Sequence, residues 1–178
     1  MTLSRPPPGQ QSTELLAGDG LLHGLHDVGG TQAVGVHQVV LGTDLAEQVL
    51  HESENDAATI ITSGIMVDES LKAYESLQAE GISVRVIDMF TWKPLDEELV
   101  IKAAKETGAI VTAENHNVTC GLGSVVANCL AKNCPTIQEF VGVQDLFGEV
   151  GPQDYLMDRF GLRAANIVEA VKKAVSRK

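Results

Sequence analysis

The sequence predicts an α/β fold in which a mainly parallel sheet lies between two layers of helices. Residues 57–63, 82–89 and 109–113 are runs rich in β-branched and aliphatic side chains. Such runs are typical of strands that are buried on both faces of a sheet. Segments with helical spacing of apolar residues separate them, and this alternation indicates βαβ units with right-handed crossovers.

Local start and stop signals place the helices. Apolar residues recur at helical spacing between residues 67 and 78, and Gly81 follows as a stop signal. Asp96 is a suitable N-cap for a helix over residues 97–107, which Gly108 ends. A third helix is expected from Gly123-Ser124 to Leu130. A fourth strand over 137–141 and helices over 153–160 and 164–175 complete the predicted order.

The first 40 residues differ from the rest of the chain. They contain the run Pro6-Pro7-Pro8 and scattered glycines without periodicity, which is typical of a poorly ordered tail. Their His23 and His26 could ligate a metal, but two histidines in a glycine-rich segment are more often incidental. We therefore predict a tail over residues 1–40 and one α/β domain over residues 41–178.

Composition and charge exclude several classes of function. The 178 residues carry a formal net charge of −11, which opposes binding to nucleic acid or to an anionic membrane. No apolar run has the length of a membrane helix, and the N-terminus lacks the apolar stretch of a signal peptide. The three cysteines have no framework or zinc-site spacing. We expect reduced thiols, no metal site and a cytoplasmic location.

Glu114 and His116 are the candidates for acid–base chemistry. They leave the third strong strand at its carboxyl end, where ligands gather in open α/β sheets. A carboxylate can orient a histidine, which titrates near neutral pH. The structural alternative is that Glu114 satisfies loop amides while His116 faces a neighbouring domain, and the lack of a nearby nucleophile favours this alternative.

Gly121, Gly123 and Ser124 are the candidates for anion binding. A Gly-x-Gly-Ser segment at the start of a helix can hold an anion with its backbone amides. A dinucleotide fingerprint would require a glycine where Val126 stands, so a tight turn and close helix packing explain the segment equally well. Trp92 ends another strand, and aromatic side chains of this kind are enriched in interfaces.

Several motifs in register resemble the C-terminal domain of transketolases, especially of short or split bacterial and archaeal ones. The resemblance runs from about Asn55 to the end of the chain. Its motifs are residues 58–64, 81–96, Glu114-Asn115-His116 with Gly121-Leu122-Gly123-Ser124, and 142–149. Leu146 and Val150 depart from the family pattern, which often has arginine and serine at these positions.

The resemblance implies a five-stranded mixed sheet whose first strand, at residues 48–52, is an antiparallel edge strand. It also implies a homodimer. In this family, thiamine diphosphate and its metal, Mg²⁺, are held by an N-terminal and a middle domain, and neither is recognisable here. The chain alone is therefore expected to bind no cofactor and to be inactive without those domains as partners.

The function implied is the C-terminal section of a transketolase, which transfers two-carbon ketol units between sugar phosphates in the pentose phosphate pathway. Two alternatives remain open. One is a free-standing module that binds a small anion or has a regulatory role. The other is the equivalent domain of a 2-oxoacid dehydrogenase beta subunit or a deoxyxylulose-phosphate synthase. The Asn115-His116 pair and the run Phe147-Gly148-Glu149 favour transketolase.

Overall fold

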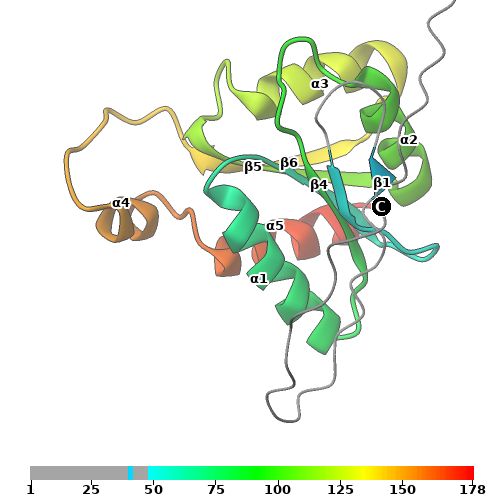
Figure 1. Cartoon of the computed structure of the whole chain (residues 1–178), viewed down its shortest axis with the longest axis horizontal. Coiled ribbons are helices and arrows are strands. Elements are labelled where there is room, and N and C mark those ends of the chain that lie inside the picture. Colours follow the sequence, from blue (N-terminus) through cyan, green and yellow to red (C-terminus); the bar gives the residue numbers. More distant parts are fainter. Residues whose placement is uncertain (1–39, 42–47) are drawn as a thin grey trace, which may run out of the picture. The chain divides into compact units, whose positions relative to one another are not determined.

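The computed structural model describes the backbone of Val40 and Leu41 and all of residues 48–178 (Figure 1). The chain divides into two units, Met1–Val34 and Gly35–Lys178, and every described residue belongs to the second unit. Except for Val40, the tail predicted over residues 1–40, with His23 and His26, lies outside the described residues.

A mixed sheet with the strand order β1-β2-β4-β3-β5-β6 runs through the described part of the chain. The strands are β1 (Val40–Leu41), β2 (Gln48–His51), β3 (Ala58–Thr62), β4 (Val84–Asp88), β5 (Ala109–Asn117) and β6 (Ile137–Val143). Strands β3, β4, β5 and β6 run parallel to one another, whereas β2 runs antiparallel to β4. This confirms the predicted five strands, and the short β1 adds a sixth beyond β2, antiparallel to it.

Helices cover both faces of the sheet, which confirms the three-layer arrangement (Figure 1). They are α1 (Met66–Ala79), α2 (Glu97–Thr107), α3 (Leu122–Asn133), α4 (Gln153–Arg159) and α5 (Ala164–Ser176). On one face, Ile60 and Val111 pack against α1 and α5. On the other face, Ile61 and Ile110 pack against α2 and α3. Because β3 and β5 are central, their side chains are buried on both faces, as the apolar runs predicted.

The predicted helix signals have the expected geometry. The Asp96 carboxylate accepts a hydrogen bond from the backbone amide of Leu99 at 2.9 Å, and Gly108 ends α2 with a φ of +68°. Gly81 follows α1 with a φ of +78°. No helix in the described part of the chain is long and apolar enough to cross a membrane.

The strand β5 extends further than its apolar run predicted. The sequence indicated a strand over residues 109–113, but parallel pairing with β6 continues to Asn117, which lies opposite Val143. The register shifts between Ala113 and Asn117, so the extension is irregular. Glu114 and His116 therefore belong to a strand end supported by β6 rather than to a free loop.

Candidate functional site

Glu114 holds the start of α3. Its side chain is buried, with 1% of its surface exposed. One carboxylate oxygen accepts a hydrogen bond from the amide of Leu122 and the other from the amide of Gly123, both at 2.8 Å. The first amides of a helix have no partner within the helix, and the helix dipole favours a negative charge at this end. The Glu114 carboxylate therefore takes the position that a bound anion would have at the start of α3.

Burial determines the protonation behaviour of Glu114. Removal from water raises the pKa of this carboxyl group above its ordinary value. The hydrogen bonds from Gly123 and Leu122 and the charge of His116 act in the opposite direction, but burial has the larger effect. A raised pKa at a strand end is a feature of many functional sites, and structural networks produce it as well.

Three glycines allow close packing around Glu114 and the start of α3. A Cβ atom added to Gly121 would lie 1.9 Å from a carboxylate oxygen of Glu114 and 2.6 Å from the carbonyl oxygen of Asn117. One at Gly123 would lie 2.6 Å from the ring of Phe140, and one at Gly142 would lie 3.1 Å from the Glu114 side chain. Gly121 and Gly142 are therefore needed for packing beside the buried carboxylate, and Gly123 is needed for packing against Phe140.

The predicted anion site has its amides already in use. The amides of Leu122 and Gly123, which an external anion would need, are bonded to Glu114. The Ser124 hydroxyl donates to the carbonyl of Val118 at 2.7 Å and accepts from the amide of Cys120 at 2.9 Å. Anion binding by Gly121, Gly123 and Ser124 stays a prediction, and it would require Glu114 to leave its position.

His116 contacts Trp92 at the carboxyl edge of the sheet. The rings lie edge to face with their centroids 6.4 Å apart, and the indole nitrogen of Trp92 donates to the Ser63 hydroxyl at 3.1 Å. His116 Nδ1 lies 3.0 Å from the carbonyl oxygen of Asn117. Because a carbonyl oxygen only accepts, this contact assigns a hydrogen to Nδ1. No hydrogen bond joins His116 to Glu114.

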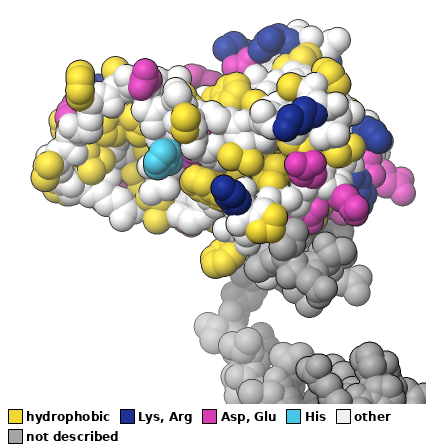
Figure 2. All heavy atoms as spheres, turned by 90° about the horizontal axis from the view of Figure 1, so that it is seen from above, with side chains coloured by type: hydrophobic (Ala, Val, Ile, Leu, Met, Phe, Trp, Pro, Cys, Tyr) yellow, Lys and Arg dark blue, Asp and Glu magenta, His cyan; other side chains and the backbone are white. Residues whose placement is uncertain are grey.

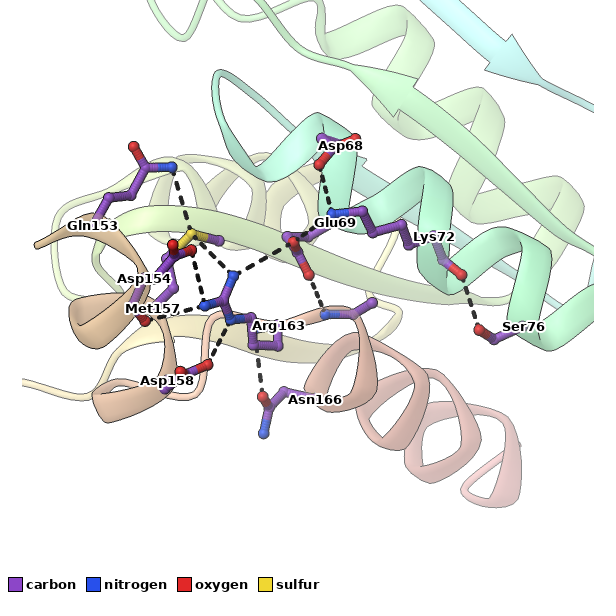
Figure 3. Close-up of polar contacts among 11 residues, drawn as sticks. Asp68, Glu69, Lys72, Ser76, Gln153, Asp154, Met157, Asp158, Arg163 and Asn166 are labelled. Atoms are coloured by element: carbon purple, nitrogen blue, oxygen red, sulfur yellow. Dashed lines mark hydrogen bonds and ion pairs between the residues drawn. The ribbon is translucent and has the colours of Figure 1, made fainter.

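A second buried glutamate connects helices on the opposite face of the sheet (Figure 3). Glu69 on α1 is 5% exposed, and its carboxylate accepts from the amide of Ala164, the first residue of α5, at 2.7 Å. Arg163 donates to Asp158 at 2.6 Å and to Asp154 at 3.2 Å, and so attaches α4 to the start of α5. Sequence analysis missed this network, since a glutamate on a helix of this composition is usually solvated.

A comparison with known protein families identifies the family of this chain. Residues 47–167, more than half of the 178, match the model of the transketolase C-terminal domain. The chain belongs to the transketolase C-terminal-domain family. This confirms the resemblance that the strand-end motifs indicated.

The relatives and a solved structure show which part of a transketolase this chain matches. It is 50% identical over 125 residues to the 6-deoxy-6-sulfo-D-fructose transketolase subunit SqwH of Clostridium sp. (strain MSTE9), covering 70% of this chain and 39% of the relative. It is 35% identical over 125 residues to the putative transketolase C-terminal section of Methanocaldococcus jannaschii, again covering 70% and 39%. A solved split gene transketolase, described as an inactive beta4 tetramer, is 47% identical with a TM-score of 0.68, over 73% of this chain and 42% of that one. The chain thus spans about two fifths of the length of these proteins.

Proposed function

We propose that this chain is the C-terminal section of a transketolase and works only together with the remaining transketolase domains. The observation that carries the proposal is the match to a protein named a transketolase subunit, over 70% of this chain but 39% of that subunit. The complete enzyme would transfer two-carbon ketol units between sugar phosphates, as in the pentose phosphate pathway. The absence of a framework spacing among the three cysteines is in keeping with a cytoplasmic enzyme.

The start of α3, the candidate anion site among the described residues, does not fit thiamine diphosphate. A diphosphate group needs free backbone amides or cationic side chains. At the start of α3, Glu114 already occupies the amides and adds a negative charge that would repel the phosphates. We therefore propose that the cofactor and its Mg²⁺ are held by other domains. The role of Glu114 would be to keep the strand end beside that site in a fixed shape.

Calorimetric titration of the chain alone with thiamine diphosphate and Mg²⁺ should show no submillimolar binding. Ketol transfer should appear only after addition of a chain that carries the other transketolase domains. A complete transketolase serves as the positive control in both measurements. Submillimolar binding with a defined stoichiometry, or ketol transfer by the chain alone, would show that this section has a cofactor site of its own.

The same proposal includes self-association into a twofold dimer, since closed symmetric pairs are the commonest oligomers. Trp92→Ala should raise the dissociation constant of the dimer by about 100-fold, because an aromatic anchor typically contributes about 1.4 kcal/mol or more and a twofold interface contains it twice. Light scattering over a concentration series measures this. Glu98→Ala, at an exposed site on α2, is the control and should leave the mass unchanged. An unchanged dissociation constant for Trp92→Ala would exclude Trp92 as an anchor.

A further inference from the structure

Large apolar side chains are exposed in the segments that follow the parallel strands. Ile65 follows β3 and Phe90 follows β4, and they are 41% and 72% exposed. Three more lie in residues 144–152 after β6, a segment that we call the arm. They are Leu146, Phe147 and Val150, of which the last two are fully exposed. Figure 2 shows a side of the molecule on which hydrophobic side chains are spread, while most charged ones gather toward one end. A surface of this kind indicates a protein contact.

The arm is held in place by polar contacts, although its apolar side chains are exposed. At its start, the Asp145 carboxylate accepts a hydrogen bond from the Asn117 side chain at 3.3 Å. Near its end, Glu149 accepts from the Tyr155 hydroxyl at 2.8 Å and from the Arg159 guanidinium at 2.9 Å. Arg163 attaches α4, which follows the arm, to the start of α5 (Figure 3). A contact made by this segment would therefore lose less conformational entropy than one made by a free loop.

Charges at this edge are complementary. Lys93 is the one lysine or arginine in the described segments 63–66, 89–96 and 114–121 at the carboxyl ends of β3, β4 and β5. It is exposed, and no ion pair joins it to another described residue. Asp145 is exposed on the arm, and its contact is to an uncharged amide. A positive group after β4 and a negative group after β6 can each find a partner in a second copy.

The strand order makes this pairing reciprocal. Along the sheet, β4 and β6 are three strand positions apart, with β3 and β5 between them. Adjacent strands are about 4.8 Å apart, so the ends of β4 and β6 are separated by roughly 14 Å. The two sites lie closer together than the strand ends, because Trp92 contacts Ser63 and His116, and Asp145 contacts Asn117. A twofold axis perpendicular to the sheet, between β3 and β5, would place β6 of each copy opposite β4 of the other. Such an interface is self-complementary.

We propose that two copies of this chain pack carboxyl edge to carboxyl edge, with the arm of each copy on the Phe90–Lys93 segment of the other. The inference rests on the proposed self-association and names its surface. Phe147 and Val150 cover Phe90, and Asp145 approaches Lys93. Burying a phenylalanine removes about 150–250 Å² from water, so the four rings of Phe90 and Phe147 account for roughly half of a standard interface.

The test uses the whole chain with Phe147→Ser and Phe90→Ser, each of which changes a side chain that is already exposed. Either variant should raise the dissociation constant of the dimer by about 100-fold in analytical ultracentrifugation, because symmetry removes the contact twice. A mixture of the two variants should dimerise more tightly than either alone, since the mixed pair keeps one intact arm on one intact partner surface. Lys93→Glu should also weaken the dimer, whereas Lys132→Glu, an equal change of charge on α3, should not.

The measured dissociation constants show whether the dimer uses the proposed surface or a different one. Unchanged dimerisation of both serine variants overturns the inference and leaves the proposed dimer in place with a different interface. A mixture no tighter than its components excludes the reciprocal arrangement. A chain that is monomeric at all concentrations, with Phe147 contacting only a chain that carries the other transketolase domains, also overturns it. That last result would leave the proposed function as a transketolase section intact, because the cofactor titration and ketol-transfer assay test it independently.

Discussion

Glu114→Ala should lower the free energy of unfolding by about 3–5 kcal/mol. The substitution leaves the amides of Leu122 and Gly123 without a partner in a buried place, and each unsatisfied buried donor costs about 1–3 kcal/mol. It also removes the negative charge that the start of α3 favours. Urea denaturation followed by circular dichroism measures the change. Glu75→Ala, at an exposed site on α1, is the matched control and should stay within about 0.5 kcal/mol of the parent.

Glu114→Gln separates hydrogen bonding from charge. An amide has one oxygen, so one of the two helix amides would face an NH₂ group, and we expect a loss of about 1–3 kcal/mol. The pKa of Glu114 is raised in the folded state, so the folded protein holds this proton more tightly than the unfolded one. The parent should therefore lose stability as the pH rises from the ordinary glutamate pKa to the raised value. Glu114→Gln should lack this decrease, and an identical pH dependence in both proteins would contradict the role of burial.

The fold could be predicted from the sequence because its signals are local. The central strands are buried on both faces, so residues 57–63 and 109–113 are runs of mostly aliphatic and β-branched side chains. Asp96 and Gly108 bound α2 through contacts within a few residues. The family resemblance then gave the antiparallel first strand, which periodicity did not indicate.

The candidate site could be predicted only in part. Sequence reasoning placed Glu114, His116 and Gly121 at one strand end, and the structural alternative that Glu114 satisfies backbone amides agrees with its contacts. Sequence reasoning did not show that the amides bonded to Glu114, those of Leu122 and Gly123, are the ones that an external anion would need. Leu122 and Gly123 lie eight and nine positions after Glu114 in the sequence. The direction of their amides therefore depends on the turn between them, which local sequence patterns do not specify.

Contacts between distant segments gave no sequence signal. Glu69 binds the amide of Ala164, which is 95 residues away, and Phe90 and Phe147 come together only in a second copy under our proposal. Exposure of Phe147 could not be read from the sequence, because a phenylalanine before Gly148 also fits a buried turn. Only the tertiary structure shows that Phe90 and Phe147 are exposed.

A buried arginine stabilises the opposite end of the sheet. Arg85 on β4 has a side chain that is 4% exposed, and it lies between three carboxylates from separate segments. Its guanidinium nitrogens lie 2.6 Å from Glu106 on α2, 3.0 Å from Glu52 after β2 and 3.8 Å from Asp56 before β3. The Asp56 side chain is also buried. Removing one partner of such a cluster leaves the remaining charges without compensation.

Arg85→Met should therefore lower the free energy of unfolding by about 1–3 kcal/mol, less than for a fully buried pair, because the side chains of Glu106 and Glu52 are 43% and 34% exposed and water can reach them. Lys102→Met is the control, because Lys102 is 55% exposed at its side chain and also approaches Glu52, at 3.4 Å. An exposed pair contributes about 0–1 kcal/mol, so the control should change little. In a double-mutant cycle by urea denaturation, Glu106→Gln should cost less in the Arg85→Met background than in the parent. Additive losses would mean that Arg85 stabilises the domain through packing of its stem and not through its charge.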